Sequence, residues 1–262
     1  MSTKHVFDDA TGLVEKACLG VASTNPDLRF FAHHKVLYNA AHPRDKVAIL
    51  AGGGAGHEPA FSGLVGSGLV TVAVSGDVFA SPSSKQICSG VDLAPTDKGI
   101  VTIVLNYTGD CLNFGLASEK ARSAFHSEGK GRDIEMVIVG DDVSVGRSKG
   151  GLVGRRGLTG AAFTAKVLGA ASEKGDDVQK IAHLGRTMVK NFVTVGSSLD
   201  HCHVPGRSTD PKERGALSQS AVEIGMGIHN EPGAKHIENK PSAENLIKEM
   251  LELLLREDDP ER

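Results

Sequence analysis

Residues 51–59 read Ala51-Gly52-Gly53-Gly54-Ala55-Gly56-His57-Glu58-Pro59, and this stretch decides the fold. It follows the unbroken apolar run Val47-Ala48-Ile49-Leu50, which is typical of a parallel strand covered on both faces. Glycine buries no side chain and loses much conformational freedom on folding, so four glycines in five positions do not favour ordinary packing. We therefore expect a tight turn at the carboxyl end of a strand, where open α/β sheets bind their ligands.

The first two hundred residues alternate predicted strands and helices. Three further strands are predicted at residues 69–74, 99–105 and 134–139, and each is followed closely by a glycine and an acidic residue. Residues 22–45 are expected to form a loop, because Pro26 and Pro43 interrupt them. Helices are predicted over residues 6–20, from near Pro59, from Ser81, after Asp110, and over 158–173 and 176–192. This alternation predicts an α/β protein with a mostly parallel sheet flanked by helices.

The C-terminal part is organised differently. Residues 197–220 lack periodicity and are expected to form a loop or boundary, followed by a strand at 222–229 and a helix at 242–256. One strand and one helix are too few to build a core. We therefore expect residues 1–200 to form an N-terminal α/β domain, and residues 201–262 to form a linker and the start of a second, incomplete α/β domain.

Composition narrows the function classes. The 262 residues carry a formal net charge of −3, with no tryptophan and 4% aromatic residues, which argues against nucleic-acid binding. No apolar run approaches the roughly 20 residues that span a bilayer, and the N-terminus lacks a secretory pattern. The four cysteines are scattered, which is typical of reduced thiols. We expect a cytoplasmic protein that binds neither membranes nor nucleic acids.

Three residues are candidates for chemistry, and each has an ordinary alternative. His57 follows the glycines, where a titratable group is costly unless it is used, although the glycines alone could form a tight connection. Asp110 could act in catalysis, but a cap on the following helix is the favoured interpretation. His229 follows the small residues Gly225 and Gly227, which leave room beside it, and it is either a site residue or a half-buried structural histidine.

Other motifs give weaker signals. No phosphate-binding P-loop or dinucleotide-binding glycine pattern is present. His201-Cys202-His203 suggests a metal, but adjacent extended residues point in opposite directions, so no metal site is expected. Arg155-Arg156 could hold a phosphate or form a surface turn, and Asp141-Asp142 are expected to serve as turn or cap residues.

Several motifs together resemble one family. They are GGGAGHEPAFSGLVGSG, SGDVFASPS, NYTGDCLNFGLASEKA, VGDDVSVGRSKGGLVGRRGLTG, SLDHCHVPGR and EIGMGIHNEPG. From about residue 6 to the end, the chain resembles the substrate-binding half of dihydroxyacetone (glycerone) kinases, most closely the fungal, ATP-dependent, single-chain type. The resemblance implies that a small ketose is held as a covalent hemiaminal on His229. It also implies that Gly53, Gly54, His57 and Asp110 bind the ketose, with Asp110 as the base and His57 as an acid or base.

The resemblance carries expectations about partners as well. ATP and Mg²⁺ are expected on a separate helical nucleotide domain, absent from this chain and supplied in cis or in trans, and a homodimer is expected. Many relatives have a basic residue where this chain has Leu105, which puts one substrate contact in doubt. The expected function is therefore ATP-dependent phosphorylation of dihydroxyacetone, or of glyceraldehyde. The alternatives are a non-catalytic ketose-binding or regulatory homologue, and a remnant that folds poorly because its second domain is incomplete.

Overall fold

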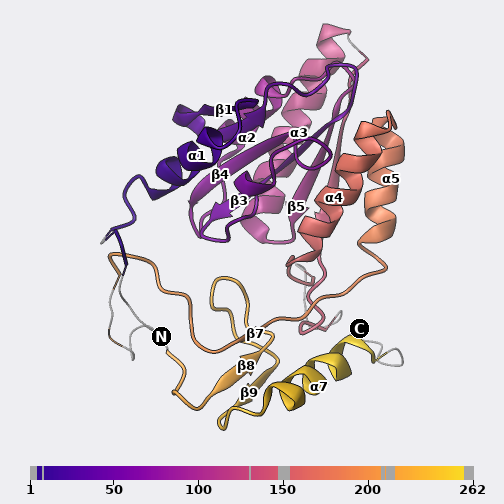
Figure 1. Cartoon of the computed structure of the whole chain (residues 1–262). Coiled ribbons are helices and arrows are strands. Elements are labelled where there is room, and N and C mark those ends of the chain that lie inside the picture. The colour runs from indigo at the N-terminus through magenta and orange to yellow at the C-terminus, as the bar shows by residue number, and fades with distance from the viewer. Residues whose placement is uncertain are drawn as a thin grey trace.

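The computed structural model describes residues 5–7, 9–129, 131–146, 154–207, 210 and 216–256 (Figure 1). Its largest feature is a six-stranded sheet with the order β1-β2-β4-β3-β5-β6. The strands β3 to β6 pair in parallel, whereas β1 and β2 are antiparallel additions at one edge. The strands are β1 (Leu28–Phe31), β2 (Val36–Asn39), β3 (Ala48–Ala55), β4 (Val72–Val78), β5 (Ile100–Leu105) and β6 (Ile134–Val139). The predicted α/β architecture is confirmed.

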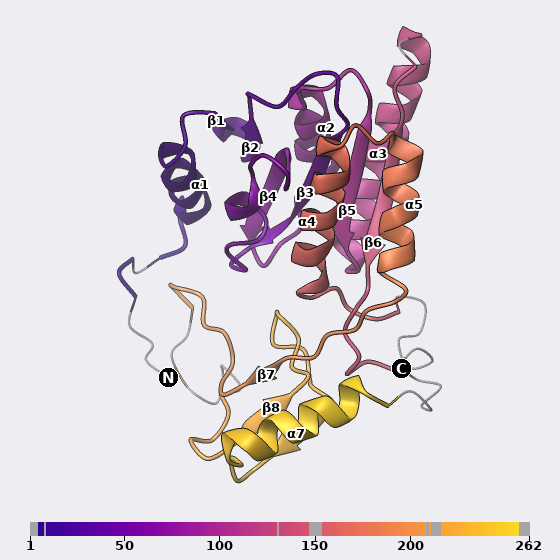
Figure 2. The ribbon, with the colours of Figure 1, turned by 45° about the vertical axis from the view of Figure 1, so that its right-hand side comes forward.

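Helices cover both faces of this sheet. Helices α4 and α5 lie on one face, and α2 and α3 lie on the other (Figures 1 and 2). The central strand β5 is buried along all six residues, as its continuous apolar run predicts. The helices are α1 (Leu13–Ser23), α2 (Ser84–Leu93), α3 (Thr108–Glu128), α4 (Gly160–Glu173) and α5 (Val178–Met188), and the 3₁₀ turns are η1 (Ala32–His34) and η2 (Ser62–Leu64).

Three expectations about these elements need correction. Residues 22–45 contain β1 and β2 rather than a loop, because Pro26 and Pro43 lie outside the two short strands and bound them. The helix predicted from residue 6 begins only at Leu13. The helix predicted near Pro59 is reduced to the turn η2.

The glycine-rich stretch is also different from the prediction, because β3 continues through it to Ala55. A Cβ on Gly52 would lie 2.4 Å from the carbonyl oxygen of Val74, and one on Gly54 would lie 2.8 Å from the backbone nitrogen of Ala80. Gly56 has a φ of +97°, and a Cβ there would lie 2.6 Å from the ring of Phe79. These glycines therefore allow neighbouring segments of the chain to pack closely against β3. The sequence analysis had argued against such a packing role.

A second, antiparallel sheet with the order β7-β8-β9 lies beyond one end of the large sheet, together with α7 (Figures 1 and 2). Strand β8 is shorter than predicted, because Gly225 has a φ of +80° and turns the chain. The apolar side chains of Ile247, Leu251 and Leu255 are exposed at α7. The elements are β7 (Ser197–Ser198), β8 (Val222–Ile224), β9 (Lys235–Ile237) and α7 (Ala243–Leu254).

A buried ion pair joins the two sheets. Asp142, which follows β6, is fully buried and binds Arg156, with 2.7 Å between its Oδ2 atom and the arginine Nε. The same guanidinium donates to the carbonyl oxygen of Gly225 at the end of β8. Arg155 is buried as well and donates to the carbonyl oxygen of Val145, so neither arginine lies in a surface turn, one of the two alternatives that the sequence left open.

The neighbouring Asp141 has a capping role, as expected. Its carboxylate accepts hydrogen bonds from the backbone N–H groups of Leu158 and Gly160 at the start of α4. Within the part of the chain that the structure describes, no helix is long and apolar enough to cross a lipid bilayer.

Candidate functional site

The candidate site lies at the carboxyl ends of β3 and β5. The chain passes from β3 to β4 on one side of the sheet, and only later to β5 on the other side, so the strand order reverses here. Such switch points are where open α/β sheets bind ligands. The ladder between β3 and β5 ends at the pair Gly52–Val104, which leaves the following backbone of β3 without a strand partner on that side.

A small cavity of about 20 Å³ lies at this point, which is room for roughly one water molecule. All five residues that the sequence analysis assigned to the site line this cavity. The lining residues are Gly53, Gly54, His57, Ala60, Phe61, Leu105, Tyr107, Asp110, Ile228 and His229.

Gly53 differs from the other glycines of β3. A Cβ there would lie 3.8 Å from the ring of Phe61 and 3.9 Å from Oδ1 of Asp110, which are ordinary contacts. Substitution at Gly53 would therefore fill cavity space without clashing with the backbone, whereas Gly54 is required by the packing of β3.

Asp110 is a buried carboxylate in the first turn of α3. Its side chain is 5% exposed, and Oδ1 has no hydrogen-bond partner among the described residues. Burial raises the pKa of this carboxyl, although a hydrogen bond from Ser81 and the proximity of His229 act in the opposite direction. Asp110 is not the N-cap of α3, because that position is Tyr107 and no side-chain cap bond forms there. Its carboxylate does lie in the first turn, where a negative charge complements the helix dipole as expected.

His57 and His229 come from different sheets and meet in the site. Their Nε2 atoms are 3.1 Å apart, and their rings are nearly perpendicular. Phe79 stacks on the ring of His57 at 5.0 Å between centroids, and Tyr107 contacts His229 edge-on at the same separation. Burial, and then the neighbouring His229, lower the pKa of His57 to about 4, so His57 is neutral at pH 7.

Glu231 is a site residue that the sequence analysis missed. Its Oε1 atom lies 2.9 Å from Nδ1 of His229, and its Oε2 atom accepts the backbone N–H of the same histidine at 2.9 Å. Burial alone would raise the pKa of Glu231, but these hydrogen bonds outweigh it and lower the pKa to about 2. A Cβ on Gly227 would lie 2.0 Å from Oε2, so the room that this glycine leaves is occupied by Glu231.

These contacts assign the tautomers of both histidines. A carboxylate only accepts hydrogen bonds, so Nδ1 of His229 carries the hydrogen that Glu231 accepts. In the neutral form of His229, Nε2 is then an acceptor, and Nε2 of His57 is the donor to it. The lone pair on Nε2 of His229 is therefore available to an electrophile, such as a carbonyl carbon, once His57 moves away.

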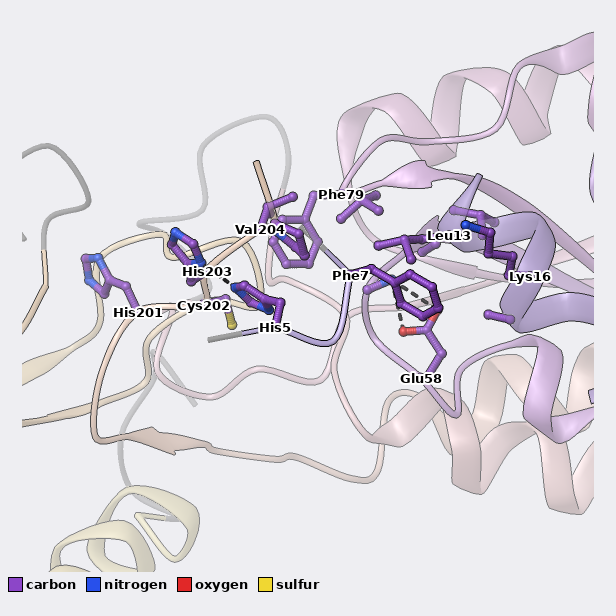
Figure 3. A pocket seen from close by; sticks show the side chains of 16 residues that line it. His5, Phe7, Leu13, Lys16, Glu58, Phe79, His201, Cys202, His203 and Val204 are labelled. Atoms are coloured by element: carbon purple, nitrogen blue, oxygen red, sulfur yellow. Dashed lines mark hydrogen bonds between the residues drawn. The ribbon is translucent and has the colours of Figure 1, made fainter. Parts of the chain in front are cut away.

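A second, larger cavity of about 800 Å³ lies beyond Phe79 (Figure 3). Glu58 lines this second cavity rather than the site, and it accepts the backbone N–H of Gly56. His203 also faces it and is hydrogen-bonded to His5 at 2.7 Å. Among the described residues, no group of three or more histidine, cysteine, aspartate or glutamate side chains could hold a metal ion.

The fold and the site together define an α/β domain that places two hydrogen-bonded histidines and a buried carboxylate at a strand switch point. The model of the Dak1 domain family matches residues 19–262, and the chain belongs to this family. It is 43% identical to a dihydroxyacetone kinase of Pichia angusta, over 100% of this chain and 44% of that protein. It is 37% identical to the human triokinase/FMN cyclase, over 96% of this chain and 42% of that protein. The chain thus spans less than half the length of these relatives.

The chain also superimposes on solved structures of dihydroxyacetone kinases and of a related co-activator. The dihydroxyacetone kinase of C. freundii superimposes with a TM-score of 0.84 and 34% identity, covering 98% of this chain and 46% of that one. A dihydroxyacetone kinase operon co-activator, DhaQ, superimposes with a TM-score of 0.80 and 30% identity, covering 92% of this chain and 70% of that one.

Proposed function

We propose that this chain is the substrate-binding part of an ATP-dependent dihydroxyacetone kinase, and that it holds a small ketose as a hemiaminal on His229. The observation that carries the proposal is the hydrogen-bonded series Glu231–His229–His57, which ends in a cavity beside the unpartnered Oδ1 atom of Asp110. In this proposal the chain divides near residue 200, and the second part brings His229 to the substrate domain.

The covalent step follows from the assigned tautomers. The lone pair on Nε2 of His229 forms a bond to the carbonyl carbon, and the π electrons of the carbonyl move onto its oxygen, which takes a proton from solvent. The imidazole ring, still protonated on Nδ1, then carries a positive charge. The carboxylate of Glu231 lies 2.9 Å from Nδ1 and stabilises that charge.

Asp110 is the proposed base for the hydroxyl that receives the phosphoryl group. A buried carboxylate with a raised pKa is a better proton acceptor than an exposed one, and its free Oδ1 atom is available to the hydroxyl. His57 is neutral at pH 7 and donates a hydrogen bond to the hemiaminal oxygen in place of Nε2 of His229.

Phosphoryl transfer also needs a nucleotide. The described residues do not form a Mg²⁺ site. A dihydroxyacetone kinase from C. freundii has been crystallised with AMP-PNP and Mg²⁺, which supports ATP and Mg²⁺ as the co-substrate pair of the family. The proposal assigns both to a nucleotide domain that acts on this chain in cis or in trans.

The test is direct detection of the adduct with dihydroxyacetone labelled with ¹³C at its carbonyl. We expect the carbonyl resonance to be replaced by a tetrahedral-carbon resonance on binding, and His229→Asn to abolish this change. His203→Asn is the matched control, because His203 is hydrogen-bonded to another histidine outside the site. A tetrahedral resonance that persists in His229→Asn would refute the nucleophile assignment.

A second candidate function is ketose sensing without phosphoryl transfer. The similarity to the operon co-activator favours it, because that protein activates a dihydroxyacetone kinase operon and shares the fold over 92% of this chain. The two functions are separated by adding the helical nucleotide domain of a relative together with ATP. Phosphate transfer supports the kinase function, whereas adduct formation without transfer supports the sensor.

A further inference from the structure

We infer that Asn230 is a positioning residue for the proposed nucleophile, because its side chain ties the turn that carries His229 to the backbone of Cys202. This inference rests on the proposed hemiaminal at His229 and deepens it by naming what holds that histidine. Asn230 is not among the described residues that line the cavity, so it acts through the position of His229.

The amide group of Asn230 makes two reciprocal hydrogen bonds to one residue. Its Oδ1 atom accepts the backbone N–H of Cys202 at 2.7 Å, and its Nδ2 atom donates to the carbonyl oxygen of Cys202 at 3.1 Å. Both bonds need a side chain that carries a donor and an acceptor in one planar group, as an amide does. Asn230 and Cys202 are 28 positions apart, so the amide joins two separate segments.

The backbone of Asn230 also suits this role. Its φ is +66°, in the left-handed region that asparagine tolerates better than most residues. The backbone N–H of Asn230 donates to the carbonyl oxygen of Gly227 at 3.1 Å, and the N–H of Gly227 donates to the carbonyl oxygen of Glu231 at 2.9 Å. These bonds close a turn over residues 227–231, with His229 at its centre.

The bonds within this turn shape it but do not fix where it lies relative to the rest of the protein. The guanidinium of Arg156 holds the chain at Gly225, before the turn begins. The bonds between Asn230 and Cys202 hold it again, at the residue directly after His229.

The segment of Cys202 is itself held by a further contact. The adjacent His203 is hydrogen-bonded to His5, at 2.7 Å between ring nitrogens, and Figure 3 shows the two side chains beside Cys202. The turn of His229 is therefore connected, through Asn230, to a segment that borders the cavity beyond Phe79.

A turn that is free to shift presents Nε2 of His229 to a carbonyl carbon for only part of the time, and the affinity for the ketose falls by that fraction. Two hydrogen bonds that restrict the turn account for a change of about tenfold. Asn230→Gly removes both bonds and keeps the left-handed backbone, because glycine adopts a positive φ readily. We therefore expect this variant to fold normally and to form the adduct about tenfold more weakly.

The experiment makes two measurements on the 262-residue chain and on Asn230→Gly. The first is the adduct affinity for dihydroxyacetone labelled with ¹³C at its carbonyl. The second is hydrogen exchange at the backbone amide of Cys202, which should be faster in Asn230→Gly, with the amide of Thr24 at the end of α1 as the reference.

Asn191→Gly is the matched control for the same change of residue. It removes an exposed bond outside the site, which Asn191 donates to the carbonyl oxygen of Thr187 at 2.7 Å. We expect this variant to have the adduct affinity and the Cys202 exchange rate of the wild type.

The outcomes separate this inference from the proposed function. A weaker adduct together with faster exchange at Cys202, in Asn230→Gly and not in Asn191→Gly, supports the inference. Wild-type affinity in Asn230→Gly, an unchanged exchange rate, or equal losses in both variants overturns the inference and leaves the proposed function standing. If the wild-type chain gives no tetrahedral resonance, the proposed function fails and the inference fails with it.

A measurement on the wild type alone decides the question if Asn230→Gly does not fold. Because coupling between two events is reciprocal, a saturating concentration of dihydroxyacetone should slow the exchange of the Cys202 amide relative to that of Thr24. An adduct that forms without this slowing overturns the inference.

Discussion

The Nε2 atoms of His57 and His229 lie 3.1 Å apart although 172 positions separate these residues in the chain. This contact closes the site, because it occupies the position that a carbonyl carbon would need in order to reach His229. The cavity that remains has a volume of only about 20 Å³, which is too small for a triose. In the proposed function a ketose therefore displaces the hydrogen bond from His57. The contacts and burial of the site residues lead to four predictions.

Glu231→Gln should weaken adduct formation by about ten- to a hundredfold, because a hydrogen bond to a charged partner contributes about 1.5–3 kcal/mol. The amide retains the shape of the carboxylate but cannot balance the positive charge of the modified imidazole. The measurement is the affinity for ¹³C-labelled ketone at pH 7. Glu238→Gln is the control, since Glu238 is paired with His236 on the surface, and equal losses in both variants would contradict the assignment.

Asp110→Asn should make the chain more stable at pH 7 while suppressing phosphate transfer by a factor of about 10² to 10⁴. The sign follows from the raised pKa, because a carboxyl that holds its proton more tightly when folded destabilises the protein in its ionised form. Urea unfolding of the chain measures the first effect, and transfer in the presence of a nucleotide domain measures the second. A destabilised variant, or one with an unchanged transfer rate, would argue against this account of Asp110.

The stability of the protein should fall as the pH is lowered from 6.5 toward 4, with His57 as one identifiable cause. The unfolded chain protonates His57 near pH 6.5, whereas the folded protein keeps it neutral down to a pKa of about 4. At pH 5 this difference costs about 1–2 kcal/mol of unfolding free energy, and His57→Asn should remove that part of the loss. Urea unfolding at pH 7 and pH 5 tests this, with His183→Asn on the exposed face of α5 as the control. An identical pH dependence in wild type and His57→Asn would contradict the prediction.

Two adjacent glycines should respond differently to substitution by alanine. Gly54→Ala places a Cβ 2.8 Å from the backbone of Ala80 and should destabilise the fold by about 1–3 kcal/mol. Gly53→Ala meets nothing closer than 3.8 Å and should fold normally, but its methyl group fills the cavity and should abolish ketose binding.

Thermal unfolding and ketose titration measure the two effects of the glycine substitutions. Gly115→Ala is the control, because nothing lies within 4 Å of a Cβ at that half-buried position in α3. Alanine is the better helix former, so this variant should be slightly more stable than wild type. If Gly53→Ala retained ketose binding, the ketose would have to lie elsewhere.

The sequence indicated the polar residues of the site better than the hydrogen bonds that connect them. His57, Asp110 and His229 were identified from residue type, from their positions after strands and from motif resemblance, and the structure brings them together. Glu231 was missed because an acidic residue two positions after a histidine gives no periodic signal, and its hydrogen bonds exist only in the folded turn. The one available indication was Gly227, whose missing side chain makes room for that carboxylate.

The fold shows the same division between local and non-local information. The parallel strands were predictable, since each is a continuous apolar run, and β5 is buried at every position. Strands β1 and β2 have only four residues each and were missed, because pairing with a neighbouring strand determines them more than their own composition does. The role of Gly52 and Gly54 depends on the chain that packs against β3, which no local pattern specifies.

The ion pair between Asp142 and Arg156 affects the alignment of the site residues, although it lies outside the site. It contributes no atom to the ketose site, yet its guanidinium holds the end of β8, and the turn that carries His229 follows directly. A substitution at either residue would leave nucleophile and base chemically intact but misaligned. The position of His229 relative to Asp110 therefore depends on residues outside the site, so a sequence can retain every motif of the site and still lose the alignment of its side chains.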